Sequence, residues 1–159
     1  SAAAVTRTVR KAVSLPISIK LAPNVPEISR IAQAVVAEGA DAITAINTMP
    51  AMLIDALAAK PVLSNRTGGL SGPALKPIAL RCVYELAQAV SVPIIGTGGV
   101  SSGIDAVEMI MAGATLVGIG SAVIEDGPSV FARICTELVT FMSINGYAQL
   151  ADLRGRALP

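Results

Sequence analysis

Short apolar runs alternate along the chain with longer segments in which apolar residues recur at helical spacing. Four of these runs have the length of a β-strand, and they cover residues 17–22, 42–46, 93–97 and 115–119. Because they are apolar at nearly every position, they indicate strands that are buried on both faces. Strands that alternate with helices predict βα units built around a parallel sheet.

The segments between these runs predict the helices. The apolar spacing indicates helices over residues 2–13, 26–38, 73 to about 90, 103–112, 129–144 and 147–153. Pro26 and Pro73 each suit a first helical turn, and Ser71 or Gly72 can cap the helix that Pro73 begins. An unusually long connection, residues 47–72, separates the second strand from that helix.

The strands end in small or polar residues, namely Ala22, Asn47, Gly98 and Gly120. In a (β/α)8 barrel such ends converge on one mouth where the binding site is built, which favours a barrel over a doubly wound sheet. A complete barrel needs eight strands and about 250 residues. We therefore expect the C-terminal half of a TIM barrel, an α/β fold with residues 1–159 as a single domain.

Composition supports one folded unit and narrows the list of partners. Of the residues, 53% are hydrophobic and 14% charged, and the formal net charge is +1. This excludes a disordered chain and gives no electrostatic reason to bind nucleic acid or an anionic membrane. The most apolar stretch, residues 109–124, contains three glycines and is shorter than the roughly 20 apolar residues of a membrane-spanning helix. The chain begins without Met, so we expect it to be the interior of a longer polypeptide.

Histidine is absent and only two cysteines are present, Cys82 and Cys135, without a CxxC motif. This pattern excludes zinc sites and histidine-based catalysis, so no metal is expected. It also favours a reducing, cytoplasmic location. Both cysteines fall within predicted helices, and we expect both in the core.

Two glycine-rich strand ends give the clearest chemical signal, IIGTGGV at 94–100 and VGIGS at 117–121. Glycines ahead of a helix offer backbone N–H donors that a phosphate can approach closely. The last two strands of a barrel are also its recurrent phosphate-binding position. The alternative is that these glycines only permit tight turns, and the occurrence of the pair on consecutive strands favours phosphate.

Lys20 lies inside an apolar strand, where a buried ammonium is costly without a partner. It alternates with Ile19 and Leu21, so we expect it to face the barrel interior, either beside an anionic ligand or paired with a core carboxylate. Asn47 and Thr48 end the second strand with an amide and a hydroxyl that suit a planar polar ligand, or simply a turn.

Several motifs occur together in order: IKLAPNV at 19–25, AINT at 45–48, TGGLSGPALKP at 67–77, IIGTGGV at 94–100 and GIGS at 118–121. In this set the chain resembles the class 1 dihydroorotate dehydrogenases, which are FMN-dependent (β/α)8 barrels of pyrimidine biosynthesis. The TGGLSG motif is closest to the NAD-linked class 1B enzymes, which pass electrons to an iron–sulfur flavoprotein partner. The segment EDGPSVF at 125–131 is reminiscent of the fumarate-linked class 1A, so the electron acceptor stays open.

The resemblance implies a role for individual residues. Lys20 would lie beside the flavin ring and favour its reduced anionic form, and Asn47 with Thr48 would hold dihydroorotate or orotate. The remaining residues around FMN would be Ile46, Gly72, Gly98, Gly99, Gly120 and Ser121, the last four on its phosphate. The family takes its proton-abstracting Cys or Ser from the first half of the barrel, so we expect residues 1–159 alone to be inactive.

Two alternatives to this function remain. The pyrimidine-reducing domain of dihydropyrimidine dehydrogenase looks similar and is the nearest one. The other is a non-catalytic half-barrel module that binds a phosphate-bearing ligand or only assembles with a copy of itself. Four strands leave two sheet edges that invite pairing, so a homo-oligomer is expected.

Overall fold

The computed structural model describes residues 1–159 and is built on a four-stranded parallel sheet with the order β1-β2-β7-β8. The strands are β1 (Ser18–Leu21), β2 (Ala42–Ala45), β7 (Ile94–Thr97) and β8 (Leu116–Gly118). All three neighbouring pairs run parallel. With helices in the connections, this is the architecture of half an α/β barrel, as the sequence predicts.

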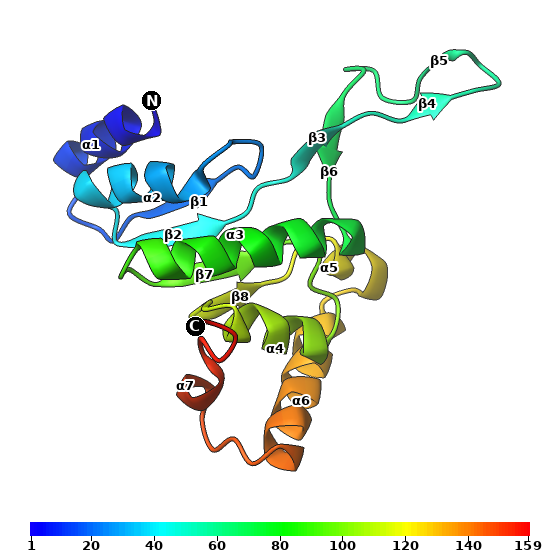
Figure 1. Ribbon diagram of the computed structural model, residues 1–159. Helices are drawn as coiled ribbons and strands as arrows, with labels where there is room; N and C mark the ends of the chain where they lie inside the picture. Colours follow the sequence, from blue (N-terminus) through cyan, green and yellow to red (C-terminus); the bar gives the residue numbers. More distant parts are fainter.

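Helices precede, connect and follow the strands (Figure 1). They are α1 (Ala2–Ala12), α2 (Ile28–Ala37), the 3-10 helix η1 (Pro73–Leu75), α3 (Lys76–Ala89), α4 (Gly103–Met111), α5 (Ala122–Asp126), α6 (Ser129–Ile144) and α7 (Leu150–Leu153). None of these helices is long and apolar enough to span a lipid bilayer.

Local sequence explains where α4 begins and ends. The hydroxyl of Ser102 accepts the N–H of Asp105 and the Asp105 carboxylate accepts the N–H of Ser102, which forms a capping box. The helix stops where Gly113, at φ +114°, takes a conformation that other residues rarely adopt.

Two helix starts differ from the prediction. Pro26 was expected in the first turn of α2, but that helix begins at Ile28 after Glu27. Pro73 opens η1 after Gly72, and the regular helix α3 starts only at Lys76. A proline fixes φ equally well in a turn that precedes a helix, so its presence alone does not identify the first residue of the helix.

The helices cover one face of the sheet. Ile43 and Ile94 are buried on that face, and a Cβ at Gly96 would meet Val83 and Met109 of the covering helices. On the opposite face Lys20 and Leu116 are exposed. The prediction that the strands are buried on both faces is therefore wrong for this chain, because no layer of residues 1–159 covers the second face.

The long connection after β2 forms an arm of antiparallel strands, residues 49–70, that projects from the body (Figure 1). Strand β3 (Met49–Ala51) pairs with β6 (Gly68–Leu70), and β4 (Ile54–Asp55) pairs with β5 (Lys60–Pro61). The sequence predicts only a connection here, because each strand has two or three residues.

The core lies between the sheet and its helices. Leu86, Ile43 and Met109 are each wholly buried there. Cys82 belongs to this core, as expected. The same prediction is wrong for Cys135, which lies on the exposed side of α6. That helix fully buries only Val130 and Ile134, one turn apart, and Leu138, Phe141 and Met142 are partly buried.

Candidate functional site

A cleft of about 120 Å³ lies at the carboxyl ends of the parallel strands. The residues that line it are Lys20, Ile46, Thr48, Ser71, Gly72, Leu75, Thr97, Gly98, Gly99, Gly120 and Ser121. The structure thus brings together every predicted site residue except Asn47. A hollow of about 270 Å³ lies at the opposite edge of the sheet, near Pro93 and Thr115, but it lacks both Lys20 and the glycine-rich strand ends.

Lys20 enters the cleft from β1 on the face of the sheet that has no helices. Its register partner on β2 is Thr44. The side chain is exposed, and none of the ion pairs of the protein includes it. Pairing with a core carboxylate, one of the two alternatives from the sequence, is therefore not seen, and the ammonium is free to face a ligand.

Two glycine loops form one wall of the cleft. The first glycine loop, residues 98–102, follows β7, and the second glycine loop, residues 119–121, follows β8. Among the backbone hydrogen bonds of turns, loops and caps, none is donated by the N–H groups of Gly98, Gly99, Gly120 or Ser121. Backbone N–H groups without an acceptor at a strand-to-helix turn are the donors that an anion requires.

The fold itself explains two of these glycines. Gly98 and Gly99 have φ of +129° and +74°, where residues with a Cβ are strained. A Cβ at Gly99 would also lie 2.7 Å from the backbone nitrogen of Lys76. A side chain at Gly99 would therefore press on the start of α3 instead of entering the cleft.

Gly120 is different, because the fold does not require a glycine there. Its φ lies outside the left-handed region, and a Cβ at this position would meet no atom within 4 Å. A side chain at this position would therefore extend into open space instead of into the fold.

An ion pair between Lys76 and Asp105 holds the first glycine loop. The Asp105 carboxylate accepts the N–H groups of Ser101 and Ser102, both at 2.9 Å, and the Lys76 ammonium at 2.6 Å. Burial acts to raise the pKa of Asp105, but the hydrogen bonds from Lys76 and the two serines outweigh it and lower this pKa to about 2. Asp105 is therefore a carboxylate at neutral pH, and it fixes the loop in place.

Of the three predicted site residues after β2, Ile46 and Thr48 line the cleft and Asn47 does not. The N–H of buried Ile46 donates to the Thr97 carbonyl at 2.8 Å, so only its carbonyl and side chain remain for a ligand. Thr48 lines the cleft and packs against Gly69 of the arm. Asn47 is exposed at the same edge of the sheet, and its N–H donates to the Leu21 carbonyl at 2.7 Å, but it does not line the cleft.

Three lining residues were not predicted: Ser71, Leu75 and Thr97. Thr97 ends β7 directly before Gly98, and Ser71 lies inside the TGGLSG motif, so both were adjacent to residues that the sequence did single out. The spacing Ser102-x-x-Asp105 is a capping-box pattern and would have identified the support of the first glycine loop.

The fold and the cleft define a parallel βα protein with a glycine-lined cleft at the carboxyl ends of its strands. A family model described as dihydroorotate dehydrogenase matches residues 1–142. The chain belongs to the dihydroorotate dehydrogenase family.

Curated relatives agree with this family. The chain is 47% identical over 154 residues to a protein of Methanothermobacter thermautotrophicus, covering 96% of this chain and 51% of the relative. It is 49% identical to a protein of Methanosarcina mazei (97% and 49% covered) and 47% identical to one of a Geobacillus species (98% and 50% covered). All three are named dihydroorotate dehydrogenase B (NAD(+)), catalytic subunit. The chain spans about half the length of these relatives.

Proposed function

We propose that residues 1–159 supply the FMN-phosphate site and part of the substrate site of a dihydroorotate dehydrogenase, which oxidises dihydroorotate to orotate in the biosynthesis of UMP. In this proposal the chain is one domain, half of a TIM-barrel FMN-binding unit. The observation that carries it is one cleft that holds both the free Lys20 ammonium and four glycine-loop residues whose N–H groups have no backbone acceptor. The family and the names of the relatives support the same function.

The two glycine loops fit the phosphate of FMN. The N–H groups of Gly98, Gly99, Gly120 and Ser121 have no acceptor among the backbone carbonyls, and the Ser121 hydroxyl adds a further donor. A dianionic phosphate needs several donors that do not have to reorganise, and rigid loops provide them.

Lys20 and the residues around it fit the flavin ring. FMN, when bound, supplies the hydride-accepting chemistry that no side chain of the protein offers. Lys20 holds a positive charge in the cleft where negative charge would develop, while Ile46 and Gly72 bound the cleft beside it. Neither neighbour carries a charge, so the ammonium sets the local potential.

Thr48, and Asn47 next to it at the edge of the sheet, would hydrogen-bond the substrate ring. The Thr48 hydroxyl lines the cleft, and the exposed Asn47 side chain offers both a donor and an acceptor. Asn47 lies outside the cleft as it stands, so its side chain has to turn toward the bound ring.

The names of the relatives indicate what kind of partner subunit to expect for this chain. The relatives are named NAD(+) catalytic subunits, which supports a separate partner subunit here, and in this proposal that partner is an iron–sulfur flavoprotein that transfers electrons. A cytoplasmic location and a homo-oligomer are part of the same proposal. The free state of both cysteines accords with a reducing compartment.

Anaerobic reduction tests the function. The full-length polypeptide that carries this chain is loaded with FMN, and dihydroorotate is added without oxygen. The proposal predicts that the flavin absorbance bleaches and that orotate forms in equal amount. Flavin that stays oxidised would contradict dihydroorotate oxidation, and reduction by NADPH with dihydropyrimidine formation from uracil would favour the dihydropyrimidine dehydrogenase alternative. Failure to bind FMN would favour the non-catalytic module.

A further inference from the structure

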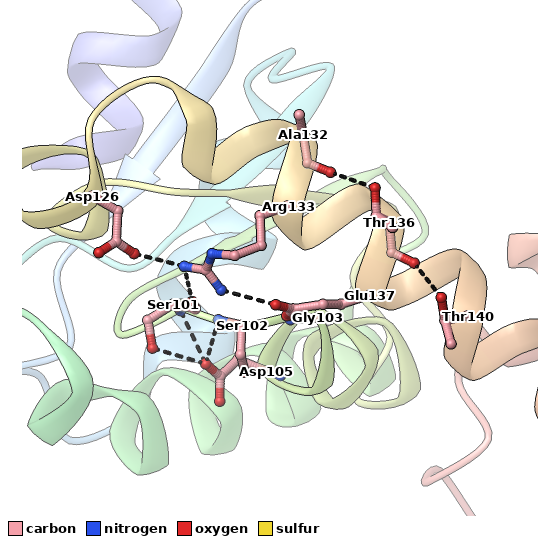
Figure 2. Close-up of polar contacts among 10 residues, drawn as sticks. All are labelled: Ser101, Ser102, Gly103, Asp105, Asp126, Ala132, Arg133, Thr136, Glu137 and Thr140. Atoms are coloured by element: carbon pink, nitrogen blue, oxygen red, sulfur yellow. Dashed lines mark hydrogen bonds and ion pairs between the residues drawn. The ribbon is translucent and has the colours of Figure 1, made fainter.

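Helix α6 carries an arginine that contacts two other segments and a glutamate of its own helix. The Arg133 guanidinium lies 2.6 Å from the Asp126 carboxylate, 3.1 Å from the Ser101 carbonyl oxygen and 3.0 Å from the Glu137 carboxylate (Figure 2). A planar guanidinium can donate in several directions at once, which an ammonium on a flexible stem cannot do at fixed positions.

Glu137 extends these contacts to the start of α4. Its second carboxylate oxygen accepts the N–H of Gly103 at 2.5 Å (Figure 2). This backbone hydrogen bond, followed by the one from Arg133, lowers the pKa of Glu137 below its usual range. A Cβ at Gly103 would lie 2.3 Å from the Glu137 Cβ, so a glycine is needed for α4 and α6 to approach this closely.

Arg133 joins the first glycine loop to the helix that follows the second. Ser101 lies in the first glycine loop, and Asp126 ends α5, the short helix that follows the second glycine loop directly. Beyond the register pair of Thr97 and Gly118, no hydrogen bond joins the two loops to each other. Arg133 therefore connects them indirectly, through Ser101 of the first loop and Asp126 at the end of α5.

We propose that Arg133 is a positioning residue that sets the spacing of the two glycine loops, so that their N–H groups converge on one phosphate. This rests on the proposed FMN site and adds to it a residue that does not touch the cofactor. A binding site keeps its geometry only when surrounding hydrogen bonds hold it, and Arg133 provides such bonds to the first glycine loop and to the far end of α5, the helix that begins directly after the second.

A purely structural role predicts something else. An exposed ion pair between residues four apart on a helix contributes little to stability and nothing to the affinity for a ligand. Arg81 and Glu85 on α3 form such a pair at 2.7 Å, with exposure close to that of Arg133 and Glu137. Arg81 has no bond to either glycine loop, so it is a matched control.

The experiment compares FMN with riboflavin, which lacks the phosphate, by fluorescence titration of the full-length protein. Arg133→Gln is expected to weaken FMN binding roughly tenfold, as groups that orient ligand-contacting residues do elsewhere. Riboflavin affinity should stay at the wild-type value. Arg133→Lys should recover part of the loss, and Arg81→Gln should change neither affinity.

Asp126→Asn gives a second, milder variant, because the carboxylate of this exposed side chain is bonded only to Arg133. It should lower FMN affinity without affecting riboflavin. The positioning role would be overturned if the Arg133 and Asp126 variants lost as much affinity for riboflavin as for FMN. It would also be overturned if both variants bound FMN as tightly as the wild type. A wild-type protein that binds FMN no more tightly than riboflavin would instead overturn the phosphate site itself, and the inference with it.

Discussion

The Lys76 ammonium lies 2.6 Å from the Asp105 carboxylate, and this contact joins the first turn of α3 to the first turn of α4. Both helices begin at the edge of the sheet where the cleft lies. Asp105 also holds the N–H groups of Ser101 and Ser102, so the ion pair and the first glycine loop form one unit.

This unit predicts a pH dependence of stability. The Asp105 pKa is about 2 in the folded protein against an ordinary 3.8, a difference of about 2 kcal/mol in folding free energy. Because the folded pKa is the lower one, the contribution is complete above pH 3.8 and is lost as the pH falls through about 2. Urea unfolding at several pH values measures it.

Asp105→Asn isolates this contribution from those of other acidic residues. The variant should be less stable than the wild type at neutral pH and should lose less stability between neutral pH and pH 2. Curves that fall in parallel over this whole range would show that Asp105 does not have the lowered pKa.

The two cysteines should differ in reactivity. Burial raises the pKa of the Cys82 thiol, although Arg81 beside it acts in the opposite direction. Cys135 is exposed on α6. Since the thiolate is the reactive form and must be reached by the reagent, a thiol reagent should modify only Cys135 rapidly in the native protein. After denaturation it should modify both cysteines. Cys135→Ser should remove the rapid phase, and its persistence in that variant would contradict the burial of Cys82.

Lys20 should affect flavin reduction more than substrate binding. The negative charge that its ammonium faces develops only as hydride arrives, so Lys20→Ala in the FMN-loaded protein should slow reduction by dihydroorotate ~10²–10³-fold. The dissociation constant of dihydroorotate should change much less. Stopped-flow recording of flavin absorbance measures both, and Lys20→Arg should restore part of the rate.

A structural role for Lys20 makes the opposite prediction. Lys20→Ala would then lower the melting temperature and leave the reduction rate near normal. The exposed, unpaired position of the side chain argues that its removal costs little stability.

Local signals in the sequence were sufficient for much of the fold. Helix α6 has the predicted bounds, and α4 starts at the predicted residue because Ser102 caps it. The four strands lie within the predicted runs, and their shared carboxyl edge follows from parallel order alone. The glycine-rich strand ends and a lysine in an apolar strand selected Lys20, Gly98, Gly99, Gly120 and Ser121 of the cleft, whereas Ile46 and Gly72 followed only from the family resemblance.

Long-range contacts were not predictable in this way. The arm consists of strands too short for a periodic pattern, and they are held by pairing across the connection. The link from Arg133 to Ser101 joins residues 32 apart in sequence, and nothing in the local spacing indicates it. The Gly99 position is also instructive, because its crowding against Lys76 is visible only in the fold. A valine there would disturb the start of α3 and would not isolate an effect on phosphate binding.

Gly120→Val tests the phosphate site most directly, because a Cβ at Gly120 meets no atom within 4 Å and the fold should tolerate it. The measurement is the dissociation constant of FMN, with riboflavin and the melting temperature as controls. The account predicts at least roughly tenfold weaker FMN binding, about 1.4 kcal/mol or more, with riboflavin affinity and melting temperature near the wild-type values. FMN affinity equal to that of the wild type would contradict it.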